Sequence, residues 1–289
     1  MRIDLHTHSR VSDGTDSPTD LVHAAARAGL QVVALTDHDT TAGWTEAAAA
    51  AQVAGISLVP GIEVSTRFRG TGVHLLVYLP DADDPALGAE LDAIVTARQE
   101  RVPRMLARLR DLGIPATEQA LAEVSGHNLV TGRPHVADLL VRLGVVASRA
   151  EAFSAYLADG GPAYVDRYAA DLTRMLEVVR GARGVAVLAH PWGRGSAEVL
   201  DETALAGLAD AGLVGLEVDH LDHTPAQRTR LREIAGRLGL LVTGSSDHHG
   251  AGKVGHDLGC ETTAPGELAR ILQRAADLGS PTRVAGKEL

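Results

Sequence analysis

The sequence predicts an α/β fold, either an α/β barrel or a doubly wound sheet, that carries an inserted helical segment. Short apolar runs typical of β-strands alternate with helical patterns, and this alternation implies parallel strand pairing. The long middle section has helical periodicity and almost no strand signal. A chain of 289 residues, 45% of them hydrophobic, can bury one large core or two modest ones.

Strands are expected where apolar runs end at turn residues. These runs are 3–5, 32–35, 56–59, 73–79, 185–189, 214–218 and 240–243. The helical patterns between them have ordinary start and stop signals: Ser17-Pro18 begins the first helix and Gly29 ends it. Further helices are expected over 44–53, 197–211, 225–238 and 265–278.

Residues 85–168 are expected to form a helical subdomain inserted into a barrel domain made of 1–84 and 169–289. Glycines divide this section into several helices. A segment of this kind can cover the mouth of a barrel, where it excludes water and selects substrates. We therefore interpret it as a cap.

Composition excludes several classes of function. The net charge of −10 argues against a long duplex nucleic acid as partner, although bound cations would reverse the field inside a pocket and admit a small anion. No apolar stretch approaches the roughly 20 residues that cross a bilayer. The start of the sequence has no basic segment followed by an apolar one, and Cys260, the single cysteine, permits no internal disulfide. A soluble cytoplasmic protein is expected, with Cys260 as a small buried residue.

Histidines and carboxylates follow the ends of the apolar runs. His6 and His8 end the first strand, and side chains two residues apart point the same way in an extended chain, so both can reach one ion. Each such residue also has an ordinary reading: a surface histidine pair for these two, a turn aspartate for Asp13, a core histidine for His74. Together they favour a functional site, because the chemistry of α/β barrels collects at the C-terminal strand ends. The candidate metal ligands are His6, His8, Asp13, His38, Glu63, His74, His190, Asp247 and His249.

Mixed histidine and carboxylate ligands suit Zn, Mn or Fe. Nine ligands exceed what one ion uses, so two or three divalent ions are expected. The charged run Asp37-His38-Asp39 abuts a buried strand, where such groups need partners.

The motifs that contain these residues resemble the four motifs of the polymerase and histidinol phosphatase (PHP) family of metal-dependent phosphoesterases. They are Asp4-Leu5-His6-Thr7-His8-Ser9 with Asp13, Thr36-Asp37-His38-Asp39-Thr40, Gly61-Ile62-Glu63, His190-Pro191 and Ser246-Asp247-His248-His249. The resemblance implies a distorted (β/α)₇ TIM-like barrel with a trinuclear site. It assigns His6, His8, Glu63 and Asp247 to one ion, Asp13, His38 and His249 to a second, and Glu63, His74 and His190 to a third. His248 stands where the family more often has an aromatic residue.

Within the family, the chain resembles the branch of nucleoside 3′,5′-bisphosphate phosphatases and short-RNA 5′-exonucleases. The run Thr131-Gly132-Arg133-Pro134-His135 is similar to that branch's Gly-Arg-Pro-His element, whose Arg and His reach the substrate phosphate. An Arg fork matches phosphate oxygens. Read without the family, the run is a helix start with Arg133 in solvent.

The resulting hypothesis is hydrolysis of a nucleotide phosphomonoester, a 3′,5′-bisphosphate or the 5′ end of short RNA, by metal-activated hydroxide. Three groups are candidates for the acid that protonates the leaving group: a metal-bound water, Asp37 and His220. Asp37 alternatively orients a ligand histidine. His220 and His223 line the pocket or lie at its rim. Histidinol-phosphate phosphatase, or a non-catalytic metal-stabilised module, is the alternative.

Two further groups receive ordinary interpretations. Lys253 and His256 are expected in a solvated loop, with contact to the substrate as the alternative. A helical stripe of arginines is expected in solvent, unless it faces the pocket and guides a polyanion. The stripe comprises Arg98, Arg101, Arg104 and Arg108.

Overall fold

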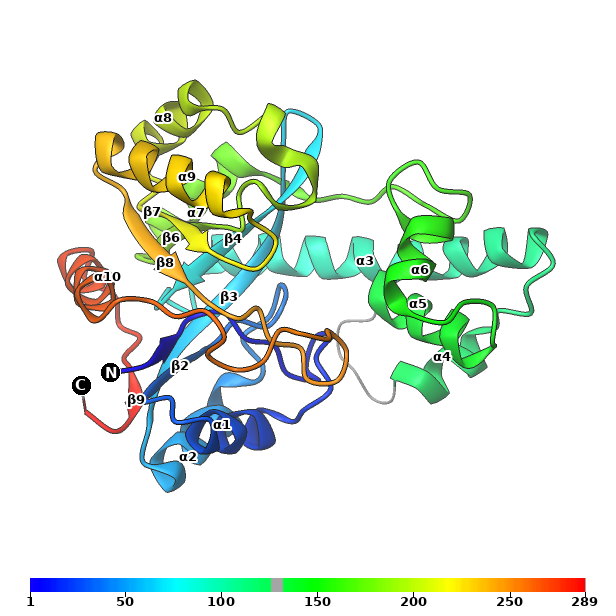
Figure 1. The fold of residues 1–289 in the computed structure, drawn as a ribbon, viewed down its shortest axis with the longest axis horizontal. Helices are drawn as coiled ribbons and strands as arrows, with labels where there is room; N and C mark the ends of the chain where they lie inside the picture. The colour runs from blue at the N-terminus through cyan, green and yellow to red at the C-terminus, as the bar shows by residue number, and fades with distance from the viewer. Residues whose placement is uncertain (126–131, 289) are drawn as a thin grey trace.

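The computed structural model describes residues 1–125 and 132–288, and its central sheet nearly closes into a barrel (Figure 1). The strands follow the order β1-β2-β3-β4-β6-β7-β8, and two short strands, β5 and β9, pair with β3. Thr7 forms a parallel bridge with His248, which brings the ends of the two outer strands together. The bounds are β1 Ile3–Asp4, β2 Val32–Leu35, β3 Ser57–Phe68, β4 Thr71–Tyr78, β5 Ala170–Asp171, β6 Val185–Ala189, β7 Gly215–Asp219, β8 Leu241–Gly244 and β9 Ala285–Gly286.

The expectation of parallel pairing is correct for β1-β2-β3 and β6-β7-β8 and wrong for β4. Strand β4 is antiparallel to both of its neighbours, β3 and β6. Phe68 pairs with Thr71 across a two-residue turn, Arg69-Gly70, in which both φ angles are positive, at 48° and 83°. Such a turn reverses the chain within a hairpin and leaves no room for a crossover helix.

Several helices of the barrel begin at side-chain caps, whereas α2 and α10 have none. The Ser17 side chain accepts a hydrogen bond from the Asp20 amide, and Thr224 forms a capping box with Gln227. The helix expected over 197–211 begins later, because Asp201 caps it and a short 3₁₀-helix, Gly193–Glu198, precedes it. The bounds are α1 Pro18–Arg27, α2 Trp44–Ala54, α7 Leu172–Gly181, α8 Glu202–Asp210, α9 Pro225–Leu238 and α10 Pro265–Asp277.

The described part of 85–168 contains helices and no strand. Its helices are α3 Pro85–Asp111, α4 Glu118–Ser125, α5 Arg133–Arg142, α6 Arg149–Ala152 and a π-helical turn, Phe153–Leu157. Figure 1 shows α3 running from the barrel to a group of helices, α4 to α6, at its far end. None of the described helices is long and apolar enough to span a membrane.

Helix α3 takes part in two hydrophobic cores. Leu87 and Ile94, in its first half, pack in a core of the barrel. Met105 and Leu109, in its second half, pack with α4, α5 and α6 in a separate core. Arg98 and Arg101 lie between the two, and each is at most 5% exposed.

The arginine stripe is therefore only partly in solvent. Arg104 and Arg108 are exposed, as expected. The expectation is wrong for Arg98 and Arg101, because the helix passes from one core to the next at this point and both sides of it are covered.

Candidate metal centre

All nine candidate ligands converge at the C-terminal end of the barrel. His6 and His8 follow β1, His38 follows β2, His190 follows β6, and Asp247 and His249 follow β8. Glu63 and His74 lie on the β3-β4 hairpin, and Asp13 comes from the loop after β1. Eight of the nine are buried, and His74 is partly exposed. Hydrogen bonding across the barrel opening supports this convergence, since the His8 amide donates to the His248 carbonyl over 2.8 Å.

The first group consists of His6, His8, Glu63 and Asp247, whose potential ligand atoms all lie within 4.8 Å of one another. The Nε2 atoms of His6 and His8 are 3.0 Å apart. Glu63 Oε2 lies 3.2 Å from the first of these nitrogens and 3.1 Å from the second. The resemblance assigned these same four residues to one ion.

Two more groups adjoin the first. One contains His8, Asp13, His38 and His249, with His249 Nε2 3.3 Å from Asp13 Oδ1. The other contains His38, Glu63 and His74, with His74 Nδ1 2.7 Å from Glu63 Oε1. His190 Nε2 is 3.2 Å from the same Glu63 oxygen. Glu63 thus stands between the groups, as a bridging ligand would.

The chemistry of this donor set fits divalent cations. Nε2 atoms of two buried imidazoles lie close together, and His8 Nδ1, His38 Nδ1 and Asp247 Oδ1 are buried without a hydrogen-bond partner. Such groups are costly to bury unless a cation satisfies them. Burial raises the pKa of the Glu63 carboxyl, but His38, His74 and His6 outweigh it and hold this pKa well below its usual range. An ionised carboxylate among imidazoles is a metal ligand in its binding form.

Glu217 holds His6 in place, and sequence reasoning missed it. This carboxylate is fully buried on β7, and its Oε1 lies 3.0 Å from His6 Nδ1. Ser245 Oγ donates to Oε1 over 2.8 Å, and the His190 amide donates to Oε2 over 2.8 Å. Burial raises the pKa of Glu217, but His6, His220 and His190 together outweigh it and the pKa falls to about 2. The sequence feature that could have revealed Glu217 is a carboxylate inside an apolar strand, Leu216-Glu217-Val218.

Asp37 binds the loop that joins His8 to Asp13. Its Oδ1 accepts hydrogen bonds from the Ser9 amide at 2.8 Å and from Ser12 Oγ at 2.7 Å, and its Oδ2 accepts one from Ser9 Oγ at 2.7 Å. These contacts favour the positioning role over that of a proton donor.

Asp39 joins the metal cluster to helix α3. It has a positive φ of 56°, and its Oδ1 accepts a hydrogen bond from the Ser65 amide at 2.6 Å. Its Oδ2 accepts from Ser65 Oγ and, at 2.5 Å, from the Arg98 guanidinium. Burial raises the pKa of Asp39, but the charges of Arg98, His38 and Arg167 and the Ser65 amide together outweigh it and lower this pKa.

His220 and His223 are both buried rather than at the rim. His220 Nδ1 accepts from the Asp222 amide, so in the neutral ring Nε2 carries the proton and faces Asp247 Oδ2 at 3.3 Å. His223 uses both nitrogens on the backbone: Nδ1 donates to the Val218 carbonyl, and Nε2 accepts from the Trp192 amide.

The expectation of a solvated loop is wrong for His256, which is buried, whereas Lys253 is partly exposed. Lys253 Nζ lies 2.5 Å from Asp247 Oδ2. His256 is buried and donates from Nδ1 to the Ser246 carbonyl over 2.6 Å. The expectation for Cys260 is also wrong, because this side chain is exposed after the 257–260 turn.

The residues at the start of α5 have different surroundings. His135 is buried, and its Nδ1 accepts from the Gly132 amide at 3.1 Å. Arg133 donates to Asp159 at 2.7 Å and lies over the rings of Phe153 and Tyr164. Thr131 lies outside the described residues. Burial lowers the pKa of His135, and the charge of Asp13 acts in the opposite direction.

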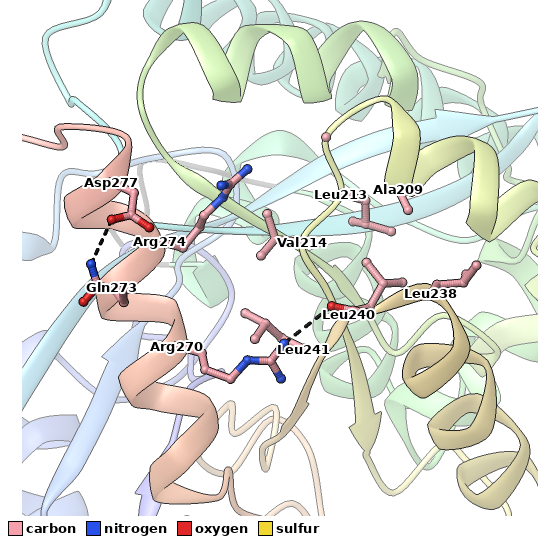
Figure 2. A pocket seen from close by; sticks show the side chains of 12 residues that line it. Ala209, Leu213, Val214, Leu238, Leu240, Leu241, Arg270, Gln273, Arg274 and Asp277 are labelled. Carbon is pink, nitrogen blue, oxygen red and sulfur yellow. Dashed lines mark hydrogen bonds between the residues drawn. The ribbon is translucent and has the colours of Figure 1, made fainter.

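A larger cavity lies away from this site. It has a volume of about 410 Å³ and is lined by residues of α10 and by residues that precede β7 and β8, among them Val214, Leu240 and Arg274 (Figure 2). These are the N-terminal ends of the strands, where barrels do not place their chemistry. A smaller cavity borders His74 and His190, at the metal cluster.

The fold and this cluster define a metal-dependent hydrolase built on an α/β barrel. The PHP domain family matches residues 4–117. A 3′,5′-nucleoside bisphosphate phosphatase of Chromobacterium violaceum is 37% identical over 257 residues, which cover 89% of this chain and 90% of that protein. A 5′-3′ exoribonuclease of Haemophilus influenzae is 36% identical over 249 residues, 86% of this chain and 90% of the other.

Solved structures agree with these relatives. A crystal structure described as a metal-dependent phosphoesterase, from Bifidobacterium adolescentis, superposes with a TM-score of 0.89 at 36% identity, over 94% of this chain and 96% of that one. The chain belongs to the PHP family and is a metal-dependent phosphoesterase, a hydrolase.

Proposed function

We propose that the chain hydrolyses a phosphomonoester of a nucleotide, either a nucleoside 3′,5′-bisphosphate or the 5′ end of a short RNA. This proposal is supported by the start of α5, where the charge of the candidate ligand Asp13 acts on the buried His135 and where Arg133 lies two residues earlier. The relatives named a bisphosphate phosphatase and an exoribonuclease support the same substrate class. A small phosphorylated substrate met in the cytoplasm suits this site better than a long duplex.

The nine candidate ligands hold two or three divalent ions, with Mn, Zn or Fe as the native metal. We assign His6, His8, Glu63 and Asp247 to one ion, Asp13, His38 and His249 to a second, and Glu63, His74 and His190 to a third. When bound, such ions lower the pKa of water and neutralise charge on a phosphate.

The site residues other than the metal ligands position the substrate and deliver a proton to its leaving oxygen. Arg133 and His135 bind phosphate oxygens, and the helix N-terminus adds its dipole. His220 holds a proton at Nε2 beside Asp247, which makes it a better candidate for delivering a proton to the leaving oxygen than Asp37, whose oxygens accept hydrogen bonds from the 9–12 loop. His223 supports the same wall of the pocket. Residues 85–168 act as the cap that excludes water over it.

The test is phosphate release with Mn²⁺ from adenosine 3′,5′-bisphosphate, a 5′-phosphorylated dinucleotide and histidinol phosphate. Wild type is compared with Arg133→Ala and with a control, Arg142→Ala, at the exposed end of the same helix. Turnover of a nucleotide that falls about 10- to 100-fold only in Arg133→Ala supports the proposal. Preference for histidinol phosphate, or equal phosphate release by wild type and Arg133→Ala, would contradict the proposal.

A further inference from the structure

Lys253 is a lysine turned inward on a loop whose next residue faces solvent. It follows the candidate ligand His249 in the segment between β8 and α10. The neighbouring Val254 is 95% exposed, whereas the Lys253 side chain is 24% exposed. Charged side chains usually lie at the surface and aliphatic ones inside, so the usual order is reversed at this pair. The reversal favours a role for the ammonium group at the site.

Contacts on both sides of Lys253 hold the loop in place. After it, His256 donates from Nδ1 to the Ser246 carbonyl over 2.6 Å. Before it, the Arg149 guanidinium donates to the Gly252 carbonyl over 3.1 Å, and a Cβ added at Gly252 would collide with this guanidinium. The backbone that carries Lys253 is therefore fixed to the barrel on one side and to the inserted helices on the other.

The two oxygens of Asp247 face in different directions. Oδ1 lies 3.4 Å from His6 Nε2 and 3.3 Å from His8 Nε2, and it is buried without a hydrogen-bond partner. Oδ2 lies 2.5 Å from Lys253 Nζ. An ion held by Oδ1 would therefore share one carboxylate with the ammonium group.

A divalent ion and an ammonium group on one carboxylate repel each other. A single negative charge does not neutralise both, and a site that excludes part of the water screens them weakly. An anion in contact with both cations relieves the repulsion. Metal ions and lysines surround a transferring phosphoryl group for this reason. Lys253 has donors to offer, because an ammonium group has three and, among the described residues, Nζ donates to Asp247 alone.

We propose that Lys253 binds an oxygen of the phosphate that is hydrolysed, together with the ion assigned to His6, His8 and Asp247. This inference rests on the proposed function, and it adds a substrate-binding residue from the loop after β8. Lysine is a compact charge on a flexible stem, which suits an oxygen that moves as the bonds to phosphorus form and break.

The test is the affinity of the Mn²⁺-loaded enzyme for inorganic phosphate, measured by titration calorimetry. Lys253→Met removes the charge and keeps an unbranched stem, whereas Lys253→Arg keeps the charge. The control is Lys287→Met, which removes the same group from an exposed position. We expect the Kd for phosphate to rise about 10- to 100-fold in Lys253→Met, by less in Lys253→Arg and not at all in the control. The kcat/KM for a nucleotide falls by a similar factor.

The affinity of the metal-free protein for Mn²⁺ separates phosphate binding from support of Asp247. Loss of the ammonium group removes a repulsive charge, so we expect Lys253→Met to bind Mn²⁺ at least as tightly as wild type. Weaker Mn²⁺ binding together with weaker phosphate binding would show that Lys253 acts only through Asp247, and it would overturn the inference. An unchanged Kd for phosphate in Lys253→Met would overturn it as well.

Failure of the proposed function gives a different result. Inorganic phosphate is a product of every phosphomonoester, so its titration reports on Lys253 whichever organic group the substrate carries. A wild-type enzyme that hydrolyses no nucleotide, but binds phosphate more tightly than Lys253→Met does, contradicts the nucleotide substrate and supports Lys253. Nucleotide turnover that is equal in wild type and Lys253→Met overturns the inference alone.

Discussion

Individual carboxylates around the metal cluster have distinct and testable roles. We expect Glu217→Gln to weaken metal binding by about 10- to 100-fold, because an amide cannot hold the His6 ring as a buried carboxylate does. Titration calorimetry of the metal-free protein with Mn²⁺ measures this directly. Glu233→Gln, at an exposed position on α9, is the control and leaves the affinity unchanged. Equal affinities in the two variants would mean that Glu217 does not orient His6.

Asp39 is expected to matter for stability. Asp39→Asn removes the charged partner of Arg98, whose guanidinium is buried, and breaking a buried pair costs about 3–5 kcal/mol. The matched control is Asp166→Asn, which breaks the pair with Arg67 at the surface and costs about 1 kcal/mol or less. Urea unfolding gives both free energies. A cost for Asp39→Asn no larger than the control's would contradict the structural role inferred for this pair.

Residues of the site differ in how visible they are in the sequence. Seven of the nine candidate ligands follow strand ends, and their convergence could be predicted because parallel strands deliver such residues to one edge, whereas Glu63 and His74 lie within β3 and β4. Glu217 was missed because a single carboxylate in an apolar strand carries no motif. The burial of Arg101 was missed for a different reason. The spacing of the arginines shows that they share one face of the helix, and only tertiary packing decides what covers that face.

Among the elements, the β3-β4 hairpin depends on its turn. Gly70 has a φ of 83°, so Gly70→Ala is expected to cost about 1–2 kcal/mol, the strain of a left-handed conformation. Gly72→Ala, two residues later and with open space around its Cα, serves as the control and is neutral or slightly stabilising. Chemical denaturation of both variants is the measurement. Equal stabilities would show that the turn tolerates a side chain.

Most elements were predictable because their boundaries carry local signals. Strands β2 and β6 match the expected ranges, and several helices begin at Ser, Asp or Thr caps or at prolines, whereas α2 begins after Gly43 without a side-chain cap. Strand direction was not predictable in the same way. The two-residue turn Arg69-Gly70 decides the direction of β4, and its geometry is set by backbone angles that the apolar pattern does not report.

For the molecule as a whole, removal of the metal is expected to abolish activity and leave the fold in place. The barrel has hydrophobic cores of its own, so a chelated protein keeps its circular dichroism spectrum. Its Tm falls, since a ligand bound to the native state stabilises by mass action. Phosphate release returns when Mn²⁺ is added back. Phosphatase activity that persists in the chelated protein would contradict a metal-dependent mechanism.

Helix α3 connects the barrel to the second hydrophobic core, and this division has an evolutionary consequence. Core residues around Met105 can be exchanged without touching a strand that carries a candidate ligand, because their core contains no strand residue among those that the structure describes. Substitutions at distant sites with no shared partners act additively. The second core can therefore diversify in descendants of this chain while the metal cluster is inherited intact.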